Sequence, residues 1–490
     1  MNWVLASSIR LGPGIFSPKN LTVYAVLFLI NLGLYQHAIK YSFFKHSDHL
    51  IYLMEMAGSK TENRICSLCD YSINKKFDKT DEILYRPLLF LFLEAQYRLW
   101  GYHYLPWNIA SFCLHLLITF LLFELLKILL PIQSALLLTL IFSTHTVTSA
   151  LATNVHLGGY MIAYALYLAG LIAILPSIIQ KSALTPRRYL LHFATNTVAP
   201  FFYEPILFFH ILSALLAAPI MKRASWARLL IYPPLVYLIL YVFRLPYTEQ
   251  LFFIPRGDNI SQIFSTENLV LIPDYFMNIL FEWLKHILHW ESSRFLGFVL
   301  MVVFFVRLIF YIGSPKKSGH LPLLFAGHLL IYLLLCCLLR GNGYQEYHPC
   351  LFLILSICFF ASTSYKKILF PKFLNGIFNA VFIFLIFFNI FLTHKKISAE
   401  NPTQTRSYFH QIEEFIDAHS KDKSFSFKIE NPNPEIDQTV NLTEGYVDQS
   451  NKQIEKSFSE MAYAPYYSKN NPKFILNWSN KSKFTPREGD

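Results

Sequence analysis

The stretch that organises this chain contains Tyr85-Arg86-Pro87-Leu88, Trp100-Gly101 and Phe142-Ser143-Thr144-His145, between positions 43 and 160. In this stretch, charged and aromatic residues gather where apolar segments give way to polar ones. A polar loop that carries Asp48-His49 precedes them. We interpret the loop as the functional part of the chain and the later apolar segments as helices that hold it in place.

The composition is that of a membrane protein. Of the 490 residues, 54% are hydrophobic and 15% are charged, whereas an ordinary soluble domain has about 25% charged residues. Apolar runs of about 20 residues, the length that crosses a bilayer core, recur through the first 392 positions. The sequence therefore predicts an all-α polytopic membrane protein.

We predict eleven transmembrane helices. The apolar run Pro87–Trp100 is interrupted by polar residues and is expected to lie in the membrane interface, and 269–290 is expected to be interfacial or re-entrant. The spans are expected near 21–39, 105–130, 132–150, 157–176, 189–201, 204–219, 228–244, 295–312, 321–339, 349–364 and 373–392.

Basic residues decide between eleven spans and twelve. With eleven, every short loop rich in Lys or Arg falls on the cytoplasmic side, as the positive-inside rule requires. With twelve, the loops at Lys316-Lys317 and Lys366-Lys367 would face the wrong way. This distribution also explains the net charge of +11 by orientation in a membrane, so we expect no binding to nucleic acid.

Two regions follow from this topology. Residues 1–392 form the transmembrane module, with a large outer loop at 40–104. Residues 393–490 form an extracytoplasmic tail on the same face as that loop, either a small domain or partly disordered. Within the tail we expect an amphipathic helix at Tyr408–Ala418 and no other clean periodicity.

Polar residues near the predicted span ends converge on the outer face. They are Asp48, His49, Arg86, His145, His156, Glu204, Tyr344, Glu346 and His348. A carboxylate there can act as a general base towards a hydroxyl, and an arginine can clamp a phosphate. Alternatively, Asp48 is a solvated loop residue, Arg86 reaches towards lipid headgroups, and His115 is a packed histidine inside a span.

Several of these segments resemble a known family, the glycosyltransferase C superfamily, and within it the branch of protein O-mannosyltransferases and tetratricopeptide-containing transmembrane transferases. The N-terminal resemblance rests on Tyr85-Arg86-Pro87-Leu88, Tyr97-x-Leu99-Trp100-Gly101, Asn108, His115 and Phe142-x-x-His145. Phe202-Tyr203-Glu204-Pro205 resembles the branch's Lys-Glu segment, with Tyr203 in place of the Lys, and Tyr344-x-Glu346-Tyr347-x-Pro349 resembles its aromatic-rich outer loop. The tail shows no tetratricopeptide repeats.

The resemblance implies a transferase that takes a sugar from a polyprenyl-phosphate-linked donor and passes it to a protein or glycan acceptor. Asp48 stands where the family has an acidic pair, so Asp48 and His49 are the expected catalytic residues. The expected substrate-binding residues are Arg86, His145, Glu204, Tyr344, Glu346 and His348. We predict no cofactor. The branch has a Pro and a Glu after the histidine that corresponds to His145, and the loss of both here, with Ser149 in place of the Glu, argues against a divalent metal, which stays the alternative.

Two other functions are alternatives: a lipid or solute transporter, and a catalytically inactive scaffold. The resemblance places the transferase in a bacterial inner membrane or in the endoplasmic reticulum membrane, with its site on the periplasmic or lumenal face. Cys66 and Cys69 lie in the first loop, where a disulfide and two free thiols are both compatible with the sequence.

Overall fold

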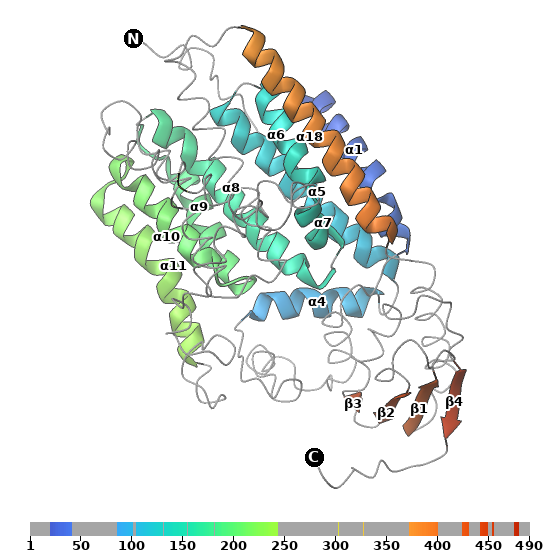
Figure 1. Ribbon diagram of the computed structural model, residues 1–490. Coiled ribbons are helices and arrows are strands. Elements are labelled where there is room, and N and C mark those ends of the chain that lie inside the picture. Colours follow the sequence, from blue (N-terminus) through green and yellow to red (C-terminus); the bar gives the residue numbers. More distant parts are fainter. Residues whose placement is uncertain are drawn as a thin grey trace.

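A computed structural model of the chain shows a bundle of helices followed by strands (Figure 1). It describes residues 20–41, 86–100, 104–130, 132–153, 155–180, 182–243 and 372–399, the strands at 424–430, 442–448, 453–454 and 475–479, and the single residues Val302 and Gly327. Before the tail, the described chain is helical. Three of its helices are long and apolar enough to cross a membrane: Leu21–Ile39, Leu105–Leu129 and Gly158–Gln180. The predicted spans between 245 and 371 lie outside the described residues, so the total of eleven stays a prediction.

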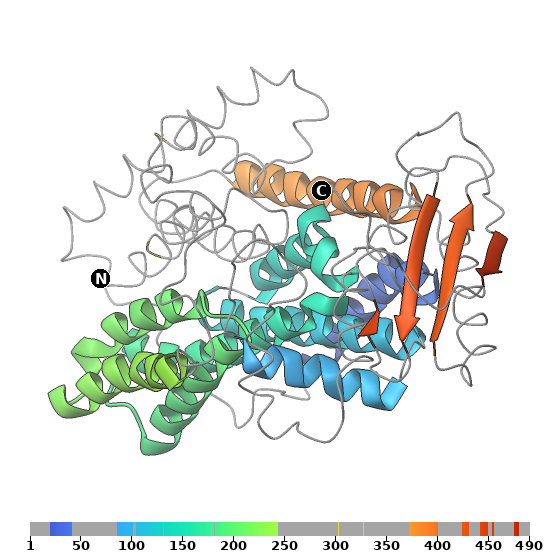
Figure 2. The same ribbon diagram turned by 90° about the horizontal axis from the view of Figure 1, so that it is seen from below.

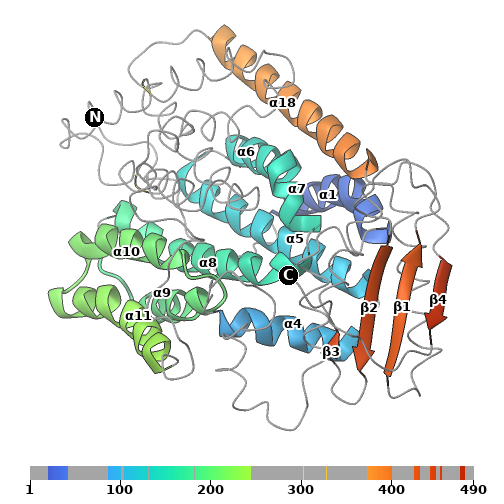
Figure 3. The same cartoon turned by 60° about the horizontal axis from the view of Figure 1, so that its bottom comes forward.

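The first and last helices of the bundle, α1 (Leu21–Tyr41) and α18 (Lys372–Ala399), run side by side in the same direction (Figures 1 and 3). Near the C-terminal end of both, the rings of His37 and His394 lie 5.8 Å apart between centroids. The chain therefore leaves both helices at the same end of the bundle, which we call the loop end. An odd number of spans requires this relation between the first loop and the tail.

Helix α4 (Pro87–Trp100) crosses the bundle at the loop end, over α5 (Tyr104–Leu129) and α8 (Gly158–Gln180) (Figure 1). Glycines at the start of α8 allow the close contact, because a Cβ at Gly159 would lie 2.3 Å from Leu89 Cδ1. Pro87 suits the first helical position, where its missing N–H removes no helix hydrogen bond. The position of α4 in a membrane interface stays a prediction.

The predicted span at 132–150 is broken. The structure has α6 (Ile132–Thr144) and α7 (Thr146–Thr153), with His145 between them, followed by the 3₁₀ turn η3 (Val155–Leu157). Thr148 Oγ1 donates to the carbonyl oxygens of Phe142, at 2.7 Å, and His145, at 2.8 Å. A hydroxyl that bonds backbone carbonyls in this way competes with the helical ladder, which accounts for a break that apolar periodicity does not reveal.

The next elements form antiparallel hairpins beside α8. They are α9 (Pro186–Val198), the 3₁₀ turn η4 (Ala199–Phe201), α10 (Ile206–Ala217), the 3₁₀ turn η5 (Ala218–Ile220) and α11 (Arg223–Phe243). Because α8 starts at the loop end, the turns into α9 and α11 lie at the opposite end. Those turns carry Arg187, Arg188, Lys222 and Arg223, so the described basic loops share one end as predicted.

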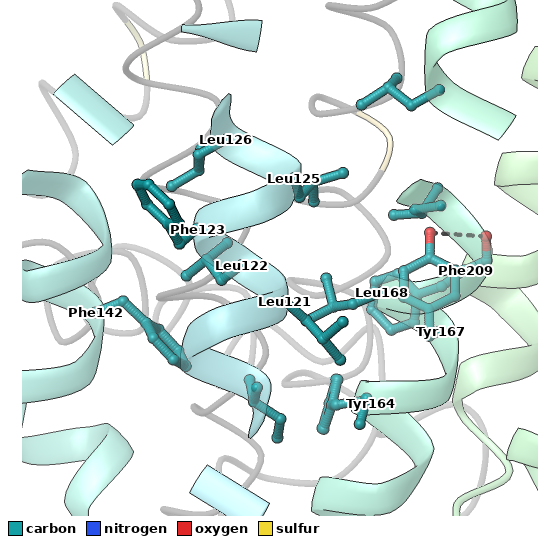
Figure 4. Close-up of a cluster of buried hydrophobic side chains, with 14 of the residues drawn as sticks. Leu121, Leu122, Phe123, Leu125, Leu126, Phe142, Tyr164, Tyr167, Leu168 and Phe209 are labelled. Atoms are coloured by element: carbon teal, nitrogen blue, oxygen red, sulfur yellow. Dashed lines mark hydrogen bonds between the residues drawn. The ribbon is translucent and has the colours of Figure 1, made fainter. Parts of the chain in front are cut away.

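The apolar core lies between α5, α6, α8 and α10 (Figure 4). Leu121 and Leu122 of α5 face Phe142 of α6 on one side and Tyr164 of α8 on the other. Tyr167 is fully buried and its hydroxyl donates to the carbonyl of Phe209 at 3.3 Å. Each large side chain buried in this way contributes about 1.5–3 kcal/mol where the alternative is water, and the core fixes the helices that carry the site.

The C-terminal tail contains strands that the sequence analysis did not predict. They are β1 (Ser424–Glu430), β2 (Leu442–Asp448), β3 (Gln453–Ile454) and β4 (Ile475–Ser479). They form one antiparallel sheet in the order β3-β2-β1-β4 (Figure 2). The alternation Ser-Phe-Ser-Phe-Lys-Ile-Glu in β1 is a strand signal, so our statement that the tail has no clean periodicity is wrong there. The expected helix at Tyr408–Ala418 lies outside the described residues.

Candidate functional site

An ion pair at the loop end joins two residues that the sequence analysis selected separately. Arg86 immediately precedes α4, and Glu204 lies in the turn between η4 and α10. Arg86 Nε lies 2.5 Å from Glu204 Oε2, and Nη2 lies 3.1 Å from Oε1. Two parallel hydrogen bonds between a guanidinium and a carboxylate give a strong, directional pairing. The pair ties the start of α4 to the start of α10.

Two tyrosine rings hold the same guanidinium. Arg86 Cζ lies 4.9 Å from the ring centroid of Tyr160 and 5.0 Å from that of Tyr203, within the range of a cation–π interaction. Arg86 Nη1 also donates to the hydroxyl of Tyr160. The two rings lie 4.5 Å apart between centroids. We call Arg86, Tyr160, Tyr203 and Glu204 the arginine cluster.

The ion pair of the arginine cluster is largely buried, and Arg86 stays charged there. The side chain of Arg86 is 8% exposed and that of Glu204 is 17% exposed. Burial alone would lower the pKa of Arg86, but the negative charge of Glu204 outweighs it, so the pKa is raised above its usual value and the side chain stays cationic. A nearby negative charge favours the charged form of a guanidinium.

The guanidinium keeps binding capacity beyond its present partners. Of its five N–H groups, three are used: one towards Tyr160 and two towards Glu204. The remaining two, one on Nη1 and one on Nη2, have no acceptor among the residues that the structure describes. The cluster therefore presents a held cation that can engage a further oxyanion.

His145 belongs to a different group of residues, next to α1 and α18. The carbonyls around the α6–α7 break are bonded by side chains from those helices. Tyr35 Oη donates to the carbonyl of Ser143 at 3.0 Å, and Thr393 Oγ1 donates to that of Thr144 at 2.8 Å. Asn31 Nδ2 adds a bond of 3.2 Å to Ser143 Oγ. We call this group the polar seam; it consists of Asn31, Tyr35, Ser143, Thr144, His145 and Thr393.

His115, which the sequence placed inside a span, is packed beside the polar seam. Its ring centroid lies 5.1 Å from that of Tyr35 and 6.1 Å from that of Phe142, and its side chain is fully buried. The structure agrees with the interpretation of His115 as a packed histidine.

Most of the remaining predicted site residues lie outside the described residues. These are Asp48, His49, Tyr344, Glu346 and His348. The backbone of His156 lies in η3, at the loop end. Of the predicted set, the structure therefore brings Arg86 and Glu204 together and places His145 at the helix break. No three His, Cys, Asp or Glu side chains of the described chain gather into a metal-binding group, and Ser149 is a buried residue of α7.

The sequence analysis missed Tyr160 and a second, partly buried ion pair. Lys127 Nζ lies 2.7 Å from both carboxylate oxygens of Glu124, at the end of α5 away from the loop end. Tyr24 Oη also donates to Glu124 Oε1. The spacing of Glu124 and Lys127 within a predicted span is a readable signal, because residues three apart on a helix are neighbours.

Comparisons with protein-family models, with curated proteins and with solved structures give no match.

Proposed function

We propose that this chain is a membrane glycosyltransferase that moves a sugar from a polyprenyl-phosphate-linked donor to an acceptor hydroxyl. The observation that carries the proposal is the arginine cluster. Arg86 and Glu204, chosen separately from two segments that resemble the glycosyltransferase C superfamily, lie against each other at the loop end. A buried, permanently charged guanidinium at the end of a helical bundle suits recognition of a lipid phosphate.

Each residue has one role in the proposed reaction. Arg86 binds the phosphate of the sugar donor, and the two tyrosines hold the guanidinium in place. Asp48, assisted by His49, takes the proton of the acceptor hydroxyl. The acceptor oxygen then attacks the anomeric carbon from the side opposite the phosphate.

The bond between the anomeric carbon and the phosphate oxygen breaks as the new bond forms. The configuration at the sugar inverts, and polyprenyl phosphate leaves with the bonding electron pair. Arg86 favours this step because negative charge grows on the departing phosphate in the transition state. His145, Glu204, Tyr344, Glu346 and His348 are the proposed lining of the site.

The helix break supports the transferase over a transporter. Transporters use broken helices whose freed carbonyls coordinate ions. Here the carbonyls of Phe142, Ser143, Thr144 and His145 each accept a hydrogen bond from Thr148, Tyr35 or Thr393. Because side chains already satisfy these carbonyls, the break offers little to an ion, and the observation favours the transferase.

Proteoliposomes that contain the purified full-length protein test the proposal against both alternatives. A polyprenyl-phosphate sugar with a labelled sugar is placed in the membrane, and a hydroxyl-bearing acceptor is added outside. We expect the label to appear on the acceptor with stoichiometric release of polyprenyl phosphate. Movement of the intact sugar donor across the bilayer would indicate a transporter, and label that stays on an unmoved donor would indicate a scaffold.

A further inference from the structure

Glu204 occupies an edge of Arg86 on which a phosphate can form two parallel hydrogen bonds. The carboxylate spans Nε and Nη2, at 2.5 and 3.1 Å. A phosphate places two oxygens on a guanidinium in the same bidentate geometry as a carboxylate. Only one of the two groups can hold that edge at a time, so the pairing seen here and full engagement of a phosphate exclude each other.

Arg86 has more contacts outside the ion pair than Glu204 has. Arg86 keeps a hydrogen bond to Tyr160 and two ring faces whether or not Glu204 is present. Among the described residues, the side chain of Glu204 bonds only that of Arg86. Glu204 lies in a turn and is about twice as exposed as Arg86. When the pair opens, the carboxylate is therefore the group that moves towards water.

We propose that Glu204 is a displaceable latch on Arg86, which the phosphate of the lipid-linked sugar donor replaces at the Nε–Nη2 edge when it binds fully. This rests on the proposed function, since it assumes that Arg86 receives the phosphate. The latch keeps the buried guanidinium paired when no sugar donor is bound, because an unpaired buried charge is costly. It also opposes binding, because the competent state of the free protein is only a fraction of the whole.

The latch predicts an effect opposite to that of a supporting residue. If Glu204 merely orients Arg86 for the phosphate, neutralising Glu204 weakens binding. If Glu204 competes with the phosphate, neutralising it strengthens binding, because Gln interacts more weakly with the guanidinium than a carboxylate does. The direction of the change in affinity therefore separates the two roles.

The test measures binding of farnesyl phosphate to the full-length protein in phosphatidylcholine nanodiscs, with farnesol as the control that lacks the phosphate. We expect Glu204→Gln to raise the affinity for farnesyl phosphate by about tenfold. Glu124→Gln is the matched control, because it removes a carboxylate from the ion pair at the opposite end and should leave the affinity unchanged. Unchanged or weaker binding by Glu204→Gln would overturn the latch.

A second variant protects the test against misfolding. Glu204→Asp keeps the charge but shortens the reach to Arg86, so its affinity for farnesyl phosphate should also rise; a fall would count against the latch. Phosphatidylglycerol added to the nanodiscs tests whether any anionic lipid headgroup binds at Arg86. If phosphatidylglycerol competes with farnesyl phosphate as well as unlabelled farnesyl phosphate does, the assignment to the sugar donor is overturned. If wild-type protein and both variants bind farnesyl phosphate no better than farnesol, the proposed function fails together with the latch.

Discussion

Arg86 and Glu204 are 118 residues apart in the sequence and are joined by two hydrogen bonds of 2.5 and 3.1 Å. Taken singly, each had an ordinary explanation: Arg86 as a side chain that reaches lipid headgroups, and Glu204 as a carboxylate at a helix start. The pairing accounts for Arg86 without a lipid headgroup, because Glu204, Tyr160 and Tyr203 all contact its guanidinium. A buried pair of this kind is weak evidence for stability, which leaves room for a functional role.

Replacing Arg86 by lysine should weaken binding of the lipid-linked sugar donor. Lysine keeps the charge but cannot form two parallel hydrogen bonds or stack a planar group on the tyrosine rings. We expect Arg86→Lys to lower donor affinity about ten- to a hundredfold, which corresponds to roughly 1.4–3 kcal/mol. The affinity is measured by equilibrium binding of the sugar donor to the protein in nanodiscs. Arg188→Lys, at the opposite end and bonded to Ser177, is the control; equal losses in both variants would mean that Arg86 has no special part in binding.

Much of the helical arrangement could be predicted, because the length of the apolar runs sets the helix bounds and the basic residues set the orientation of the helices. The bounds of α1, α4, α5 and α8 follow from apolar runs and from the polar interruptions within 87–100. The shared end of the basic loops follows from the positive-inside rule. The same reasoning placed Arg86 and Glu204 at one end of the bundle, but periodicity assigns a residue to an end and not to a partner.

A glycine in α8 should prove sensitive to the addition of one methyl group. A Cβ at Gly170 would lie 2.6 Å from Asn196 Nδ2 and 2.8 Å from Thr195 Oγ1, both on the buried face of α9. Overpacking of this kind costs about 1–3 kcal/mol. We expect Gly170→Ala to lower the unfolding temperature in detergent by an amount that corresponds to this loss.

Gly33→Ala is the matched comparison, because no described atom lies within 4 Å of a Cβ at Gly33 in α1. Alanine favours a helix over glycine by about 1 kcal/mol, so this variant should be as stable as the wild type or slightly more stable. If the Gly170→Ala and Gly33→Ala proteins had the same unfolding temperature, the close packing of α8 on α9 would be contradicted.

The parallel arrangement of α1 and α18 can be tested by crosslinking in membranes. On a cysteine-free background, His37→Cys with His394→Cys should react with a short bifunctional thiol reagent, because the native rings lie 5.8 Å apart. Cleavage at a protease site introduced near residue 250 then leaves the two fragments joined. The control is Leu21→Cys with His394→Cys. Leu21 lies at the end of α1 away from His394, so the two fragments should separate after cleavage. The reverse pattern would mean antiparallel helices and an even number of spans.

The features that escaped the sequence analysis depend on contacts between distant segments. The break at His145 lies in the polar run Ser143–Ser149 of a segment that was predicted as one span. The side chains that bond the carbonyls at the break belong to Tyr35, Thr148 and Thr393. Thr393 and Thr144 are 249 residues apart, so no local pattern links them. The strand at Ser424–Glu430 is different, since its alternation is visible in the sequence and was passed over.

The most direct test of the proposed reaction is the turnover of Asp48→Asn against that of the wild type, in the same proteoliposomes and at matched protein content. Asn fills the same space but cannot take the proton of the acceptor hydroxyl, and a positioned base contributes about 10²–10⁴ in rate. We predict that sugar transfer falls at least about a hundredfold while binding of the sugar donor is unchanged. An Asp48→Asn protein that transfers sugar at the wild-type rate would contradict the role of Asp48 as the catalytic base.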